Sequence, residues 1–276
     1  MTAQSPLVSI CIPTYKGAAT LGAAIDSVLA QTYTDFELIV VDDGSPDDTA
    51  AIVARYRDPR VAYHRNPSNL GPEGNWNRCL ELARGHYFKL LPHDDTIRTD
   101  CLARQVAVLE ADRDERLALV FSSRAVLAPD GRVLMHRGMP GAREGRLPAQ
   151  QVMRACVHQG TNVIGEPGAV LTRRRLCQRV GSFDASHPYV IDLDYWFRLL
   201  AHGDAHYLEA PLASFRVSAT QWSVVIGRRQ DIDFIGLVRR AAPFFNPPLS
   251  TLDRARARWR AWANVWLRQV FYWARL

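Results

Sequence analysis

The strongest constraint on the fold is a regular alternation of short apolar runs with helix-like stretches over the first 110 residues. Residues 7–13 and 36–41 are almost entirely apolar, which is typical of strands that are covered on both faces. Between them, residues 21–29 carry apolar side chains at the spacing of one helix face. Strands separated by helices pair in parallel, so this pattern predicts a doubly wound α/β sheet.

The pattern changes after residue 110, where a tight turn is expected at Pro129-Asp130-Gly131. A hairpin at this point predicts a small antiparallel extension of a mostly parallel sheet. Before residue 110 the other predicted elements are strands at 61–64 and 87–91 and helices at 74–83 and around 102–109. After it they are strands at 117–122, 125–128, 132–135 and 169–171, a loop at 138–148, and helices at 173–180 and 192–202.

The positive charge of the chain lies in its last part. Residues 226–276 hold 10 Arg against 3 Asp, whereas the first 225 residues hold 24 basic and 25 acidic side chains. A near-neutral body without a nucleic-acid-binding motif argues against a module that binds DNA or RNA, the non-enzymatic alternative. We therefore expect no nucleic-acid partner.

A helix is predicted over residues 253–276, with Trp259, Trp262, Trp266 and Trp273 at heptad-like spacing and Arg residues between them. Aromatic and Arg side chains on one helix suit the interface of an anionic membrane. The same row of Trp side chains would equally well pack on the body of the protein or on a partner helix. Both interpretations stand on the sequence alone.

Cysteine usage and hydropathy bear on the compartment. The five cysteines are scattered and never in C-x-x-C spacing, which argues against a disulfide framework or zinc site and fits a reducing environment. No apolar run reaches the ~18 residues needed to cross a bilayer, and the first residues do not follow the signal-peptide pattern. We therefore expect a cytoplasmic protein.

Two acidic pairs follow predicted strands directly: Asp42-Asp43 and Asp94-Asp95. In a doubly wound sheet both pairs lie at the carboxyl ends of strands, where such folds bind ligands. A divalent ion of the Mg²⁺ type takes one or two protein carboxylates and completes its shell with phosphates and water. The alternative for each pair is a turn that caps the next helix.

Several nucleotide and hydrolase motifs are absent from the sequence. Neither G-x-G-x-x-G after the first strand nor G-x-x-x-x-G-K-[ST] is present, which leaves Rossmann dehydrogenases and P-loop enzymes unsupported. A G-x-S-x-G nucleophile elbow is also missing. Phosphate groups must therefore be held by a metal ion, by Arg or Lys, or by both.

Four blocks of sequence resemble glycosyltransferase family 2, which has the GT-A fold. In family order they are VSICIPTYKGAATLGAAIDSVLAQTYTDFELIVVDDGSPDDT, NLGPEGNWNRCLELARGHYFKLLPHDD, GEPGAVLTRRRLCQRVGSFD and IDLDYWFRL. The resemblance covers residues 7–218. It implies a GT-A domain at 1–225, with a nucleotide-binding half at about 1–110 and an acceptor half at 111–225, followed by the helical tail at 226–276.

The resemblance also implies roles for individual residues. Pro13 and Tyr15 match positions that line the nucleotide pocket, and Asp43 matches the acidic residue that contacts the base. Asp94 and Asp95 match the family's D-x-D-type motif, with Asp94 near the ribose and Asp95 on a Mn²⁺ or Mg²⁺ ion. The implied donor is a nucleoside-diphosphate sugar.

Asp192 matches the catalytic base of the family. On the sequence alone, an Asp in front of an apolar helical face is more commonly a helix cap. The chain departs from the family pattern at three places: Pro92 opens the D-x-D block, Ile191 replaces a Glu before the base, and Ser218 replaces a His.

The resemblance implies an inverting, metal-dependent transfer of a sugar to an acceptor hydroxyl group. We expect the acceptor to be a surface polysaccharide or a lipid-linked glycan, with the enzyme at the cytosolic face of the membrane. The alternatives are a degenerate transferase that binds the donor without turnover, and a nucleotidyltransferase, which also uses an acidic rim and a metal.

Overall fold

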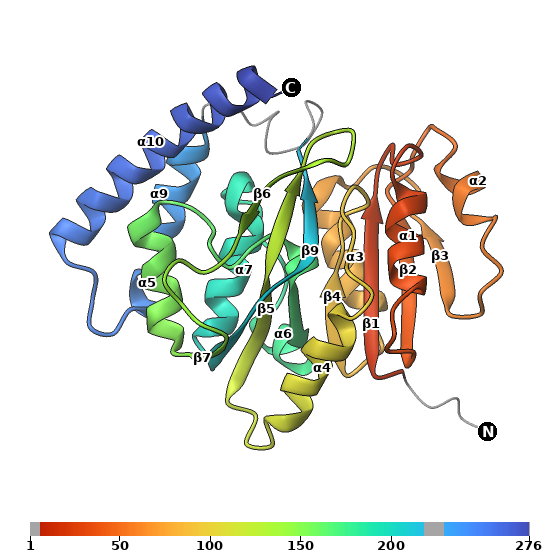
Figure 1. Ribbon diagram of the computed structural model, residues 1–276, viewed down its shortest axis with the longest axis horizontal. Helices are drawn as coiled ribbons and strands as arrows, with labels where there is room; N and C mark the ends of the chain where they lie inside the picture. The colour runs from red at the N-terminus through yellow and green to blue at the C-terminus, as the bar shows by residue number, and fades with distance from the viewer. Residues whose placement is uncertain (1–5, 218–228, 276) are drawn as a thin grey trace.

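The computed structural model describes residues 6–217 and 229–275, with side chains as far as Val270. Its centre is one nine-stranded sheet in the order β3-β2-β1-β4-β8-β5-β9-β7, with β6 paired to β5 (Figure 1). The strands are β1 (Val8–Thr14), β2 (Phe36–Asp42), β3 (Val61–Arg65), β4 (Tyr87–Leu90), β5 (Leu117–Leu127), β6 (Val133–Arg137), β7 (Gly145–Leu147), β8 (Val170–Arg173) and β9 (Asp204–Arg216).

Most of the sheet is parallel. Strands β1 to β4 pair in parallel, β5 and β9 pair in parallel, and β8 lies antiparallel between β4 and β5. Six strands therefore point in one direction, while β6, β7 and β8 run the other way. This arrangement confirms the predicted α/β class, with its mostly parallel sheet and antiparallel extension.

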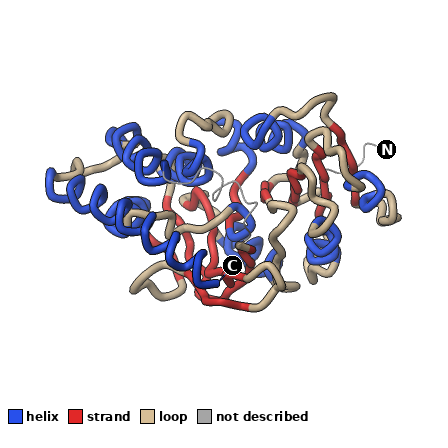
Figure 2. The backbone as a smooth tube through the Cα atoms, turned by 90° about the horizontal axis from the view of Figure 1, so that it is seen from above, coloured by secondary structure: helices blue, strands red, loops and turns tan. Residues whose placement is uncertain are grey.

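Helices cover both faces of the sheet (Figures 1 and 2). Side chains alternate along a strand, so in β2 Leu38 and Val40 enter one apolar cluster while Ile39 and Val41 enter another. The cluster of Leu38 also contains α1 and α4, and the cluster of Ile39 contains α5 and α7. The helices are α1 (Leu21–Leu29), α2 (Thr49–Val53), α3 (Gly71–Leu82), α4 (Cys101–Ala111), α5 (Ala149–Gln159), α6 (Arg174–Val180), α7 (Ile191–Leu200), α9 (Gln230–Arg240) and α10 (Thr251–Arg275).

The middle of the chain is more regular than its sequence predicts. Residues 117–128 were expected as two short strands but form the single strand β5, which pairs with both β6 and β9. The expected loop at 138–148 contains β7, whose backbone pairs with β9. Strand β9 and helix α5 were not predicted, whereas α9 lies within the predicted helical tail at 226–276.

The predicted C-terminal helix is present as α10, which packs against α5 and α9. Ala257 and Ala261 are buried in the same apolar cluster as α5 and α7. Gly160, at the end of α5, has φ +64° and leaves room for α10, since a Cβ there would come within 2.5 Å of the Ala261 nitrogen. Within the described part of the chain, no helix combines the length and the apolar character needed to cross a membrane.

Candidate active site

Three strands bring the predicted nucleotide-binding residues to one rim of the sheet. Thr14 at the end of β1 pairs with Asp42 at the end of β2, and the Asp43 N–H donates to the Thr14 carbonyl at 2.9 Å. The chain leaves β4, the other neighbour of β1, just before Asp94 and Asp95. Both acidic pairs therefore follow the carboxyl ends of parallel strands, where ligands of such sheets bind.

The acidic pair at the end of β2, Asp42 and Asp43, accepts hydrogen bonds from neighbouring parts of the chain. Asp42 accepts hydrogen bonds from the Ser45 N–H at 2.8 Å and the Tyr63 hydroxyl at 2.6 Å. Burial, together with the charge of Asp42, raises the pKa of Tyr63 to about 12, so this hydroxyl keeps its proton. Asp42 thus joins the ends of β2 and β3.

Asp43 is also buried and accepts three N–H donors: the Asn66 amide at 2.8 Å and the backbones of Leu70 and Gly71, each at 2.9 Å. Two of these donors belong to the entry of α3, whose free N–H groups need acceptors. Asp43 therefore fixes the segment that connects β3 to α3. The assignment of Asp43 to the nucleotide base remains a prediction.

The two residues predicted from β1 differ in exposure. Pro13 is buried inside the strand, whereas Tyr15 just beyond it is 41% exposed. The Lys16 ammonium lies 5.3 Å from the centre of the Tyr15 ring. Of the two, Tyr15 presents its ring at the rim.

Asp95 is almost completely buried at the end of the β4 segment. Its Oδ1 accepts the backbone N–H of Arg216 at 2.9 Å, and the Arg216 Nε donates to the Asp94 carbonyl at 3.1 Å. Burial, with the neighbouring charge of Asp94, raises the pKa of Asp95 well above its usual range. The last residue of β9 thus contacts the acidic pair that follows β4.

The chemistry of this pair fits a divalent cation. A buried carboxylate beside a second one is stabilised by a positive ion, and Asp95 is 1% exposed next to Asp94. Among the described residues, no three His, Cys, Asp or Glu side chains gather in a metal-binding group. An ion of the Mg²⁺ or Mn²⁺ type needs only one or two protein carboxylates when phosphate oxygens complete its shell.

Asp192 lies in the first turn of α7, where it is half-buried. Its Oδ1 accepts the Leu193 N–H at 2.7 Å, and its Oδ2 accepts the Asn162 amide at 2.9 Å. Burial and the charge of Glu166 raise the pKa of Asp192 to about 7. A carboxylate with a pKa near neutrality is well matched to accept a proton at neutral pH.

The loop that holds Asp192 is ordered by side-chain contacts to its backbone. Asn162 binds both polar groups of Gly165, donating to the carbonyl at 3.0 Å and accepting from the N–H at 2.9 Å. The Trp196 indole of α7 donates to the same carbonyl at 3.2 Å. Hydrogen bonds therefore join this loop to α7, the helix that carries Asp192.

Glu166 and Arg124 form an ion pair beside Asp192. Arg124 projects from β5 with a side chain only 2% exposed, and its Nη1 has no hydrogen-bond partner among the described residues. The charge of Glu166 contributes to the raised pKa of both Asp95 and Asp192, so Glu166 lies within electrostatic range of each. The predicted base and the predicted metal ligand therefore both respond to this one carboxylate.

Sequence reasoning missed Arg124 and Asn162. Glu166 stands in the GEPG block, where the sequence alone allows either a residue that faces the acceptor or a cap of the following turn. An Arg inside a strand otherwise made of apolar and small polar residues is the one signal that singles out Arg124, because a buried charge needs a partner. Ser218, the third departure from the family pattern, lies outside the described residues.

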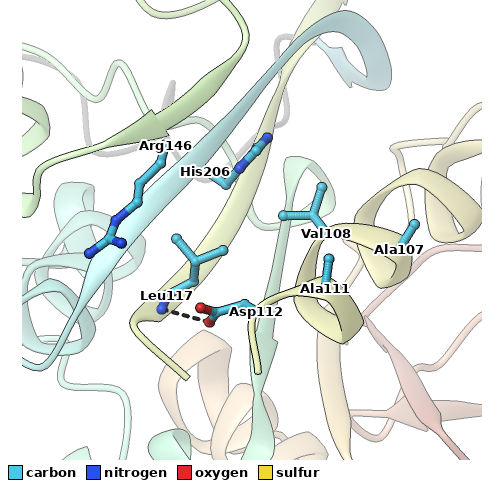
Figure 3. A pocket seen from close by; sticks show the side chains of 7 residues that line it. All are labelled: Ala107, Val108, Ala111, Asp112, Leu117, Arg146 and His206. Atoms are coloured by element: carbon cyan, nitrogen blue, oxygen red, sulfur yellow. Dashed lines mark hydrogen bonds between the residues drawn. The ribbon is translucent and has the colours of Figure 1, made fainter. Parts of the chain in front are cut away.

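A surface hollow of about 390 Å³ lies elsewhere, near the start of β5 (Figure 3). Leu117, Asp112 and His206 are among the residues that line it, and the Leu117 N–H donates to Asp112 at 2.8 Å. The start of β5 is the end of the sheet opposite the rim. None of the predicted site residues lines this hollow.

The fold and the site together combine an α/β sheet and its acidic rim with a half-buried carboxylate of raised pKa, Asp192. The family described as glycosyl transferase family 2 matches residues 9–180, more than half of the chain. The protein therefore belongs to glycosyltransferase family 2, as its sequence blocks predict.

Two curated relatives extend this comparison. The uncharacterized Mycobacterium tuberculosis protein MT1568 is 32% identical over 96% of this chain and 84% of its own length. The Escherichia coli protein WfaP, named a UDP-Glc:alpha-D-GlcNAc-diphosphoundecaprenol beta-1,3-glucosyltransferase, is 36% identical over 39% of this chain. That match spans 43% of WfaP.

Solved structures confirm the GT-A type of fold. Residues 1–349 of S. aureus TarS, in complex with UDP-GlcNAc, have a TM-score of 0.68 at 17% identity over 91% of this chain and 70% of theirs. The mannosyltransferase PcManGT from Pyrobaculum calidifontis, in complex with GDP-Man and Mn²⁺, has a TM-score of 0.65 at 17% identity. This match covers 99% of this chain and 76% of PcManGT.

Proposed function

We propose that the protein transfers a sugar from a nucleoside-diphosphate sugar to an acceptor hydroxyl group with inversion, and that Asp192 is the base. The observation that carries the proposal is the setting of Asp192, which is half-buried, has a pKa of about 7 and is oriented by the Leu193 N–H and the Asn162 amide. The presence of this carboxylate favours an active transferase over a degenerate one. Membership of the family argues against a nucleotidyltransferase.

In the proposed reaction, the acceptor oxygen attacks the anomeric carbon while the bond from that carbon to the diphosphate oxygen breaks. Asp192 takes the acceptor proton as the new bond forms. Because attack and departure occur on opposite faces of the sugar, one displacement inverts the anomeric centre. Glu166 keeps the affinity of Asp192 for a proton high, and Asn162 holds its carboxylate in place.

The departing diphosphate needs positive charge. A Mn²⁺ or Mg²⁺ ion held by Asp95, with Asp94 beside it, would neutralise that charge when bound. Arg124 has a buried N–H without a partner among the described residues, and it can donate to a ligand oxygen. These groups serve the role that glycine-rich loops play in other nucleotide-binding folds.

The nucleotide is proposed to lie along the rim. Tyr15 offers an exposed ring on which a base can stack, and Pro13 supports it from inside β1. A carboxylate can accept about four hydrogen bonds. Asp43 accepts three from its own chain, so it can accept one more from the nucleotide base. Asp94 is assigned to the ribose. The nucleotide-sugar complexes of TarS and PcManGT support a donor of this kind.

The acceptor is proposed to be a surface polysaccharide or a lipid-linked glycan, handled at the cytoplasmic face of the membrane with peripheral contact through the C-terminal tail. The printed activity of WfaP supports a lipid-linked acceptor, although this chain matches less than half of that relative. In this proposal the sheet up to residue 225 carries the chemistry, and residues 226–276 position the enzyme.

Calorimetric titration of UDP, dTDP, GDP and CMP, each with and without Mn²⁺ or Mg²⁺, tests the proposal. We expect one diphosphate to bind tightly only with metal, and this binding to be lost in Asp95→Ala. Asp192→Asn should still bind the same nucleotide but transfer sugar about a thousandfold more slowly. Failure of every nucleotide to bind in the presence of metal would overturn the proposed function.

A further inference from the structure

The helix α10 buries one side and leaves the other side without a partner among the described residues. Ala257, Ala261 and Val265, at successive i+4 positions, are buried against the body. On the opposite side, at i, i+3 and i+7, Trp259, Trp262 and Trp266 are 59%, 53% and 49% exposed. The exposed apolar side chains on and beside this side, here called the outer face, are Leu252, Trp259, Trp262, Trp266, Leu267 and Val270.

The outer face is one continuous surface along the edge of the molecule. In Figure 1 α10 runs along one edge of the molecule, with α5 and α9 on its inner side. The rings of Trp262 and Trp266 are in edge contact at 6.3 Å, and the Arg260 guanidinium lies 5.2 Å from the Trp259 ring. Large apolar patches of this kind mark interaction surfaces.

The charge beside the outer face is positive and uncompensated. Arg254, Arg256 and Arg258 are exposed, and none forms an ion pair with a described residue. Asp253, the only carboxylate within α10, is already bound to the His158 ring at 2.7 Å and to Ser250. An anionic partner therefore suits this side of the helix.

A groove of about 550 Å³ lies between α9 and α10, next to the same Arg residues. Arg239, Arg254 and Arg258 line it together with the apolar side chains of Ile235 and Val238. Three guanidinium groups beside apolar carbon match a phosphate group that is attached to a hydrocarbon chain.

We propose that the outer face of α10 and this groove dock the protein on a bilayer that contains anionic phospholipids. The helix lies in the plane of the surface, with its Trp side chains at the boundary between head groups and acyl chains. The Arg side chains bind lipid phosphates. This inference gives the membrane contact proposed above a defined surface, and it can be tested without the transfer reaction.

A bilayer suits the surface better than a second copy of the chain. Two outer faces placed together would bring Arg254, Arg256 and Arg258 of both copies close to one another without a carboxylate to offset them. Like charges in contact weaken association, whereas an anionic lipid surface attracts every one of these side chains.

Flotation of the full chain with lipid vesicles tests the proposal. We expect binding to phosphatidylcholine mixed with phosphatidylglycerol and at least about tenfold weaker binding to phosphatidylcholine alone, because each Arg near an anionic surface contributes about fivefold. The triple variant Trp259→Ser, Trp262→Ser and Trp266→Ser should lose binding. Arg254→Gln with Arg258→Gln should weaken it by about twentyfold or more, and high salt should do the same.

The matched control is Arg113→Gln with Arg137→Gln, since both side chains are exposed and lie far along the chain from α10. It should bind vesicles like the wild type. Circular dichroism checks that every variant is folded, and nucleotide titration, expected to be unchanged in all of them, separates this proposal from the transferase proposal.

Three results would overturn the proposal: no binding to anionic vesicles, equal binding by the Trp variant, or equal loss in the control. A dimer seen by light scattering and abolished by the Trp substitutions would assign the outer face to a second copy instead. Salt-sensitive binding to RNA or DNA, lost in the Arg254 and Arg258 variant while vesicle binding is absent, would assign it to nucleic acid.

Discussion

The carboxylates at the end of β2 and those around Asp192 have the same chemistry but different surroundings. Asp42 and Asp43 accept five hydrogen bonds between them from nearby loops and strands. Asp192 accepts two, and it lies half-buried near the negative charge of Glu166. The first pair therefore stabilises local structure, whereas the surroundings of Asp192 favour a bound proton.

This contrast shows that an acidic cluster in a sequence does not by itself reveal a reactive group. Backbone N–H donors that surround a carboxylate satisfy its charge and make it structural. Burial beside another negative charge raises the pKa of a carboxylate, so the carboxylate readily binds a proton or a cation. Asp95, which is buried next to Asp94, shares a raised pKa with Asp192.

The largest effect is expected at Asp192. Asp192→Asn removes the proton acceptor, so kcat should fall by about a thousandfold, within the range for loss of a general base. Donor affinity, measured by calorimetry, should stay within a factor of about two because the variant leaves the rim intact. Turnover at the wild-type rate would place the base elsewhere.

The next effect is expected at Asp95. Asp95→Asn should weaken metal-dependent binding of the diphosphate by about a hundredfold, since the ion loses its buried carboxylate. Chelation of the metal from the wild type should give the same loss, and the variant should not respond to chelation. The exposed Asp35 offers a control, and Asp35→Asn should bind like the wild type.

Substitution of Asp43 should lower the stability of the protein rather than kcat. In Asp43→Asn one carboxylate oxygen becomes an NH₂ group, which cannot accept the hydrogen bonds that this oxygen accepted. The free energy of unfolding should therefore fall by about 1–3 kcal/mol. Urea denaturation measures this loss. Asp48→Asn, an exposed change nearby, should leave the midpoint unchanged. A variant that unfolds at the wild-type midpoint would contradict the structural role of these three hydrogen bonds.

The smallest effect is a shift in the pH profile. Asp192 must be ionised to accept a proton, so the rate should rise with pH through about 7 and then level off. Glu166→Gln removes a negative charge that raises this pKa, so the rise should move to lower pH. Burial remains, so the pKa should stay above that of an ordinary Asp. Glu209→Gln, at an exposed position, should leave the profile in place; an unmoved profile in Glu166→Gln would exclude the coupling.

Much of the nucleotide half could be predicted because its signals are local. Each buried strand is an apolar run, and each acidic pair directly follows its strand. The short strands β1 and β2 therefore lie within a residue of their predicted positions. Asp42 and Asp43 could be assigned to the rim because both follow the carboxyl end of a parallel strand.

The acceptor half was harder to predict because its contacts join distant parts of the chain. Helix α5 does carry an apolar face, with Val152, Met153, Cys156 and Val157 all buried, but the Gly- and Arg-rich segment before it obscured the pattern. Arg124 and Glu166 lie on separate elements, and Asn162 reaches Asp192 across 30 positions. No periodicity within one window indicates such pairings.

The bond between the Arg216 N–H and Asp95 joins residues 121 positions apart. Closing so long a loop costs entropy before any contact is gained, so such contacts form late in folding. A chain growing on the ribosome can therefore complete the strands β1 to β4 long before β9 exists. Its acidic rim acquires its final geometry only after residue 216 has been made.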